Sequence, residues 1–223
     1  MAYINTKTLP LELRPYLLLF LELITESPIR RPEDNVLIPH EEVVAALESD
    51  TVSLRTSLGL ESTKQFSCGS YSHTAVLMIS VDYNKYVRGI QWIVDLLQNT
   101  EFTVDRIRVC GAKISNAVSQ AKRNGNAVTH DLLKAMFYAP ETNVRSCSLI
   151  HQHRFLNSLL EKLDNEEHAK TIINDLNRLR AELVTPNRLS LYVAANWEKT
   201  VKANTSDLIE PWSKIFKDGA VFK

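Results

Sequence analysis

The spacing of apolar residues changes once along this chain of 223 residues, close to Asn84. Before that point, residues 51–58 alternate between polar and apolar, and residues 73–83 form a denser apolar run. Both patterns are typical of strands. After it, apolar residues recur at the helical period for about a hundred residues. Because strands and helices are segregated rather than alternating, the pattern predicts an α+β fold.

The expected sheet is antiparallel and has about four strands. The connection between 51–58 and 73–83 is too short for a helical crossover, so these two strands should pair as neighbours in an antiparallel meander. A strand over residues 2–8 precedes them in the chain. A last strand over residues 188–195 has no other partner and must return to the same sheet.

Several helices are expected to cover this sheet. Pro10 suits the first turn of an amphipathic helix that continues to Ser27, and Pro39 begins a short second helix. Gly125 is a natural end for a helix that starts near Thr103. Further helical patterns lie at residues 86–97, 129–138, 148–163 and 164–183.

One domain with a C-terminal extension is the expected organisation. Residues 1–198 should form a single α+β domain, because no linker rich in Gly or Ser divides them. Residues 199–223 are similar to a linker with one short helix around Pro211 and Trp212. A strand that begins at Ala2 and a linker-like end are what we expect of a segment cut from a longer polypeptide.

The charge balance argues against nucleic acid as a partner. The chain has 26 Lys and Arg and 26 Asp and Glu, so its formal net charge is zero and it has no strongly basic footprint. The basic residues of the helix near 103–123 are expected to form a solvated helix face. The apolar run at residues 16–20 is too short to span a bilayer, so no membrane partner is expected.

The cysteines predict a reducing compartment. Cys68, Cys110 and Cys147 are odd in number and widely separated, and they form no C-x-x-C pair. We expect three reduced, mostly buried thiols. The N-terminal residues lack the features of a secretory signal. The cytoplasm is therefore the expected location, with the mitochondrial matrix as the alternative.

Two groups of residues invite a metal hypothesis, and neither is expected to bind metal. His151 and His153 lie on a predicted helix, where residues two apart point in different directions. Asp164, Glu167 and His168 lie at the spacing of the inverted zinc motif H-x-x-E-H, with Asp in place of the first His. Asp164 is better explained as the residue that caps a helix.

No catalytic motif is visible in the residues. There is no G-x-S-x-G nucleophile elbow, and the glycine-rich phosphate-binding motifs are absent. A divergent enzyme would need a pocket that gathers polar residues distant in sequence, such as His73, His130 or His151.

Several short segments resemble the pitrilysin (insulinase) family of zinc metallopeptidases, in particular its presequence-protease-like branch. The resemblance rests on residues 9–23 (LPLELRPYLLLFLEL), 27–29 (SPI), 38–44 (IPHEEVV) and 191–197 (LYVAANW). It implies a domain of the metallopeptidase/LuxS-like type. It also implies a parent polypeptide of four such domains around an enclosed chamber, with H-x-x-E-H on the first long helix of the active domain.

The zinc motif of that family falls on residues 19–23 of this chain. Glu22 stands where the general base would be, but Leu19 and Leu23 stand where the family has histidine. Leucine has no lone pair for zinc, so the chain is expected to contribute no catalytic, metal-binding or cofactor-binding residue. Zinc would belong to the catalytic domain of the parent zinc metalloendopeptidase.

The resemblance therefore implies a non-catalytic domain, most similar to the third, that forms part of the substrate chamber. Its partners would be the other domains of the same polypeptide and the peptide substrates of the parent. A free-standing interaction or scaffold protein, related to the non-peptidase members of the family, is the alternative.

Overall fold

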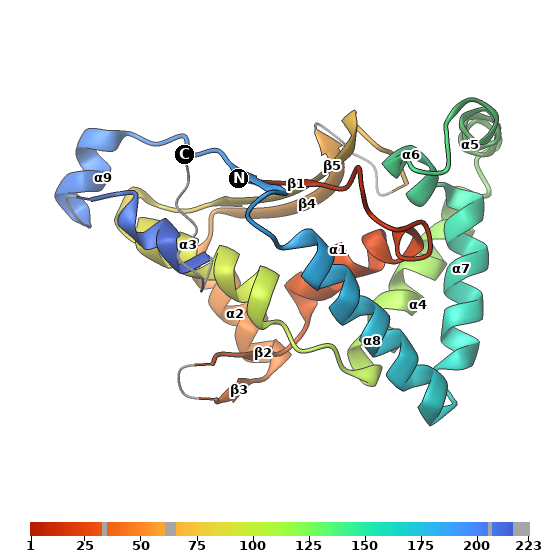
Figure 1. The fold of residues 1–223 in the computed structure, drawn as a ribbon, viewed down its shortest axis with the longest axis horizontal. Coiled ribbons are helices and arrows are strands. Elements are labelled where there is room, and N and C mark those ends of the chain that lie inside the picture. The colour runs from red at the N-terminus through yellow and green to blue at the C-terminus, as the bar shows by residue number, and fades with distance from the viewer. Residues whose placement is uncertain (33–34, 61–65, 205–206, 216–223) are drawn as a thin grey trace.

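The chain folds as an α+β structure built on a four-stranded antiparallel sheet (Figure 1). The computed structural model describes residues 1–32, 35–60, 66–204 and 207–215. The strands follow the order β4-β5-β1-β6 across the sheet. Their bounds are Ala2–Asn5 for β1, Ser53–Leu60 for β4, Ser70–Ser80 for β5 and Leu189–Leu191 for β6. The predicted fold class is confirmed, and the last strand returns to the sheet as expected.

The sheet order differs in one respect from a simple meander. Strands β4 and β5 form the expected hairpin, but the strand next to β5 is β1. Strand β1 lies between β5 and β6, with Ile4 opposite Ala75 on one side and Leu189 on the other. The N-terminal strand is thus a central strand.

Nine helices in the described part of the chain carry most of the remaining residues, and several gather on one side of the sheet (Figure 1). Their bounds are Leu17–Glu26 (α1), His40–Asp50 (α2), Tyr86–Val94 (α3), Val104–Ala121 (α4), Gly125–Phe137 (α5), Asn143–Ser146 (α6), Leu149–Lys162 (α7), Glu166–Leu183 (α8) and Trp197–Ala203 (α9). Helix α3 continues as a π-helical turn over Asp95–Asn99.

Some boundaries differ from the prediction for identifiable reasons. The first helix begins only at Leu17 and follows a 3-10 turn over Arg14–Tyr16, because Pro15 has no N–H to donate in a regular helix. Gly125 does not end a helix; it is the first residue of α5, and the side chain of Asn124 accepts a hydrogen bond from the N–H of Ala127. Strand β1 ends at Asn5, three residues before the predicted end at residue 8.

A second, two-stranded sheet was not predicted. Strand β2 (Ile29–Arg30) pairs with β3 (Leu37–Ile38) between α1 and α2. Two residues per strand are too few to give a period-two pattern, so the sequence carries no usable signal for them.

The two faces of the main sheet differ in character. Ile4, Ala75 and Leu77 are fully buried and share the face that the helices cover. Arg55 and Ser190 lie on the opposite face, where they are exposed. This alternation is what an antiparallel sheet with one solvated face requires.

A close approach of two glycines shapes the β4–β5 hairpin. The register shifts between Leu58 and Leu60, and Gly59 between them has a φ of +74°. A Cβ at Gly59 would lie 2.6 Å from both the N and the O of Gly69. Only glycine fits this position, because the backbone is left-handed and the neighbouring strand is in contact.

The C-terminal segment packs back against the domain. It contains α9 and a 3-10 turn over Glu210–Ile215. Trp212 is buried; its Nε1 donates to Tyr86 Oη at 2.6 Å, and Tyr86 Oη donates to the carbonyl of Leu208 at 2.8 Å. The residues expected as a linker therefore include a segment fixed to α3.

Candidate functional site

Helix α1 places Leu19 and Leu23, the two leucines that the resemblance aligns with zinc-binding histidines, inside the core. Leu19 and Leu23 are both fully buried, and Phe20 between them packs edge to face against Phe102. Two buried leucines offer neither a lone pair nor a water-accessible face. These residues do not fit a zinc ion.

Glu22, which the resemblance aligns with a general base, is held by an ion pair. Lys113 of α4 donates its Nζ to Glu22 Oε1 at 2.5 Å and to Glu26 Oε1 at 2.5 Å. These hydrogen bonds, first to Glu22 and then to Glu26, raise the pKa of Lys113. Arg106 also binds Glu26, with Nη2 at 3.1 Å from Oε2. Part of the basic face of α4 thus pairs with the carboxylates of α1.

The histidine and acidic groups considered as metal ligands do not converge in the structure. His151 and His153 lie on α7 as predicted. The cap of α8 is Asn165, whose Oδ1 accepts from the N–H groups of Glu167 and His168; the assignment of the cap to Asp164 was wrong. The side chain of Asn165 fills the capping position. The neighbouring Asp164 stays exposed and forms an ion pair with Arg108. Within the described ranges, no group of three or more His, Cys, Asp or Glu side chains is placed to hold a metal ion.

All three cysteines are free thiols, and Cys110 and Cys147 are buried. Burial raises the pKa of Cys68 to about 11, of Cys110 to about 11 and of Cys147 to about 12. A thiol with a raised pKa is protonated at neutral pH and is a poor nucleophile. These thiols have the character of core residues.

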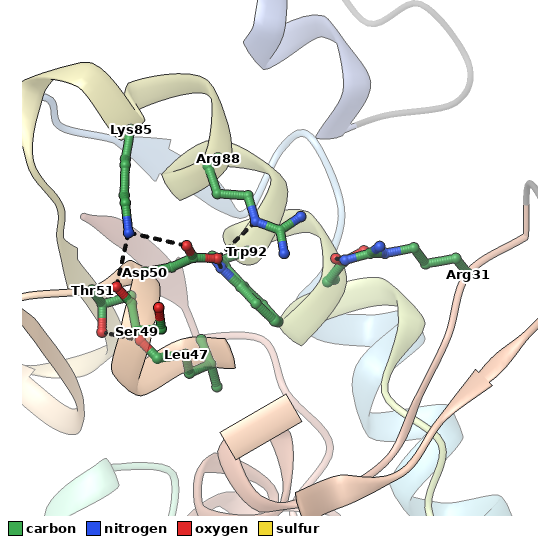
Figure 2. A network of polar contacts seen from close by, with 9 residues as sticks. Arg31, Leu47, Ser49, Asp50, Thr51, Lys85, Arg88 and Trp92 are labelled. Atoms are coloured by element: carbon green, nitrogen blue, oxygen red, sulfur yellow. Dashed lines mark hydrogen bonds and ion pairs between the residues drawn. The ribbon is translucent and has the colours of Figure 1, made fainter. Parts of the chain in front are cut away.

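A dense polar network joins the end of α2 to α3 (Figure 2). Asp50 accepts hydrogen bonds from Lys85 Nζ at 3.2 Å, Arg88 Nε at 2.8 Å and Trp92 Nε1 at 2.9 Å. The bond from Arg88 is the largest cause that lowers the pKa of Asp50 to about 2. The Arg88 guanidinium also lies over the Trp92 ring, 4.9 Å from its centroid. Three donors occupy this carboxylate, so its role is to fix α2 on α3.

A second buried carboxylate lies at the π-helical turn. Asp95 is fully buried; it accepts from Arg31 Nη2 at 2.7 Å, Gln91 Nε2 at 3.1 Å and Asn99 Nδ2 at 2.9 Å. Asp95 is the first residue of this turn, and its carboxylate binds Arg31, the residue that follows β2. The ion pair between Arg31 and the buried Asp95 therefore ties the β2–β3 hairpin to the π-helical turn.

The surface has two adjoining hollows between α5, α6 and α7. The α5–α7 groove has a volume of about 630 Å³ and is lined by residues of α5 and α7 that include Leu132, His151 and Arg154. The Arg14 pocket has a volume of about 210 Å³ and is lined by Arg14, Arg145 and His151 among others. A divergent enzyme would gather polar residues such as His73, His130 or His151 in one pocket. Of these three, only His151 lines these two hollows.

Comparison with known proteins gives distant relatives without a described activity. No family model matches the chain. The chain is 26% identical over 220 residues to an uncharacterized protein of Schizosaccharomyces pombe, and the match covers 96% of the chain. It is 26% identical over 209 residues to one of Saccharomyces cerevisiae and 25% identical over 217 residues to one of Caenorhabditis elegans, covering 92% and 96% of the chain.

The relatives are much longer than this chain. The matched segment spans 20%, 19% and 20% of their respective lengths, so the chain corresponds to about a fifth of each. In the described part of the chain, no helix is both long and apolar enough to cross a membrane.

Sequence reasoning did not find the residues that make the most contacts at these sites. Asp50, Asp95 and Arg14 have partners that are distant in the chain, and periodicity gives no information about such pairs. Asp131 is a similar case, because it lies on α5 but accepts from the N–H groups of Leu149 and Ile150 at the start of α7. For Asp50, its place at the end of a predicted helix was the one local signal.

Proposed function

We propose that this chain is a non-catalytic domain of a pitrilysin-type zinc metalloendopeptidase, where it forms part of the chamber that encloses peptide substrates. The observation that carries the proposal is the state of α1. The resemblance aligns this helix with the one that carries the zinc motif in that family, and in this chain Leu19 and Leu23 of α1 are fully buried. The domain would shape the chamber and would leave the chemistry to another domain.

The state of Glu22 supports a non-catalytic role. A general base must reach a water molecule or substrate, whereas Glu22 is bound to Lys113 at 2.5 Å. Zinc would be a cofactor of the parent protein only.

The length of the relatives supports a part within a larger protein. A match that covers nearly all of this chain and about a fifth of each relative is what one domain of a multidomain polypeptide gives. The partners would then be the other domains of the same polypeptide and the peptides inside the chamber. The proposed location is the cytoplasm, with the mitochondrial matrix as the alternative.

The test measures zinc and peptidase activity on the chain alone and on the full-length fission-yeast relative. We expect no stoichiometric zinc and no chelator-sensitive cleavage of unstructured peptides by the chain. We expect both from the full-length protein, provided that another domain holds an intact H-x-x-E-H. Tight zinc binding by the chain alone would contradict the non-catalytic assignment.

A matched pair of variants sharpens this test. In the full-length protein, replacement of the glutamate aligned with Glu22 by glutamine should leave cleavage within about twofold of the starting rate. Replacement of the glutamate in an intact H-x-x-E-H should abolish cleavage. Equal loss in both variants would contradict the proposal.

The alternative is an interaction or scaffold protein related to non-peptidase members of the family. Exposed apolar side chains on α5 favour some form of docking in either case, since Met136 and Phe137 are 78% and 80% exposed. A full-length relative that binds partners but neither holds zinc nor cleaves peptides would support the scaffold.

A further inference from the structure

The buried guanidinium of Arg14 lacks partners for part of its donors. Arg14 is 2% exposed, and its Nη2 donates to the carbonyls of Thr6 at 2.7 Å and Lys7 at 3.0 Å. Its Nε and Nη1 are buried, and neither has a hydrogen-bond partner in the described part of the chain. Buried donors are nearly always paired, so this orphaned edge indicates a ligand.

Further cationic groups lie around the same space. Arg145 lines both the Arg14 pocket and the α5–α7 groove, and Arg154 lines the groove. His151 also lines both hollows, but burial and the charge of Arg145 lower its pKa, so it is a neutral hydrogen-bonding group there. None of the ion pairs among the described residues involves Arg14, Arg145 or Arg154. The two hollows therefore meet at a site with three arginine side chains close by and no bound carboxylate.

The acidic side chains nearby, Asp131 and Glu141, offset only part of this charge. Asp131 is buried and is already bound to the start of α7, where it accepts from Ser148 Oγ at 2.9 Å and Leu149 N at 2.9 Å. Glu141 acts on Arg14 only through space and is itself exposed. Among the described residues, no carboxylate lines the Arg14 pocket, while Asp131 lines the adjoining groove.

Part of the lining of the groove is apolar. Leu132 and Ala135 come from α5, while Ile150 and Phe155 come from α7. Met136 and Phe137 of α5 are strongly exposed. A small inorganic anion would use only the cationic end, whereas a peptide with acidic and apolar side chains would use the whole surface.

We propose that this surface binds an acidic, amphipathic peptide segment. One carboxylate enters the pocket and accepts hydrogen bonds from Arg14, Arg145 and His151. Apolar side chains of the same segment pack into the α5–α7 groove. The inference rests on charge complementarity and on the orphaned donors of Arg14, and it holds whether or not the parent protein is a peptidase.

The test is a fluorescence polarisation titration with the purified chain. The probe is a fluorescein-labelled peptide of about twelve residues that alternates Glu and Leu and contains one Phe. A second peptide with every Glu replaced by Lys is the control. We expect saturable binding of the acidic peptide and none of the basic one, with weaker binding at high salt.

Matched variants locate the site. Arg145→Glu should weaken binding about tenfold or more, because a charge-assisted hydrogen bond is lost and a repulsion is added. Arg123→Glu makes the same change on an exposed residue outside both hollows and should alter binding by less than about twofold. A rise in Tm on adding the peptide, seen in the wild type and in Arg123→Glu but not in Arg145→Glu, would separate binding from a folding defect.

Competing probes decide between ligand classes. Inorganic phosphate and a single-stranded oligonucleotide are titrated in parallel. Displacement of the peptide by phosphate only at millimolar concentration supports the proposal. Failure of the acidic peptide to bind, equal binding by Arg145→Glu, or tight binding of the oligonucleotide in place of the peptide would overturn it.

Discussion

Replacement of Asp50 by Asn should cost about 1 to 2 kcal/mol of folding free energy at pH 7. The pKa of Asp50 falls from 3.8 to about 2 in the folded chain, and a shift of that size converts to roughly 2.4 kcal/mol at most. Lys85 and Arg88 are themselves 38% and 42% exposed, so solvent screening reduces the value. Asn still offers one side-chain oxygen to the Nε1 of the buried Trp92, so the substitution mainly removes the charge that Lys85 and Arg88 bind.

The pH dependence of this contribution has a definite sign. Because the folded pKa of Asp50 is depressed, its stabilisation is fully present above the unfolded pKa near 3.8. It is lost as the pH falls through the folded value of about 2. Linkage gives roughly half of the contribution remaining at pH 3. The difference in free energy of unfolding between the wild type and Asp50→Asn should therefore become smaller as the pH falls from 6 to 3.

The assay is urea unfolding followed by tryptophan fluorescence at several pH values between 6 and 3. Glu101→Gln is the matched control, because Glu101 forms an exposed ion pair with Arg30 and should contribute less than about 0.5 kcal/mol. A cost for Asp50→Asn no larger than that of Glu101→Gln, or a gap that stays constant with pH, would refute the reasoning.

Three further substitutions test the packing. Leu23→Ala should lower the free energy of unfolding by about 3 to 5 kcal/mol, because Leu23 is fully buried; chemical denaturation measures this, and a cost below 1 kcal/mol would contradict the burial. Gly59→Ala should cost about 2 kcal/mol or more, since its Cβ would lie 2.6 Å from the Gly69 backbone, and a neutral effect on Tm would argue against this hairpin geometry. Tyr86→Phe removes the bond to Leu208 and that from Trp212; proteolysis should cut the C-terminal segment faster, and unchanged cutting would count against the packed-back tail.

Most of the fold could be predicted from local patterns. Periodicity alone predicts β4, β5 and α8. The return of β6 to the sheet follows from its need for a partner strand. The wrong assignment of the α8 cap arose because two local rules competed. Asp164 and Asn165 are adjacent and can both cap a helix, and only the backbone geometry selects Asn165.

The candidate site was much less accessible to sequence reasoning. The identities of Leu19 and Leu23, on which the proposed loss of zinc ligands rests, can be read from the sequence alone. The environment of Arg14 depends on α6 and α7, which lie more than a hundred residues later in the chain. No local pattern carries information about a donor that a distant helix leaves unpaired.

The position of β1 has a consequence for how the domain is made. Its central place means that β1, which is synthesised before the other three strands of this sheet, waits for Leu189–Leu191 before its second edge is covered. Until then, a nascent chain presents the open edge of β1, and such edges invite association with other chains. Closure over so long a separation also raises the contact order, so we expect the sheet to be completed slowly during folding. A protein that assembles several such units in one polypeptide would have to protect each open edge in turn.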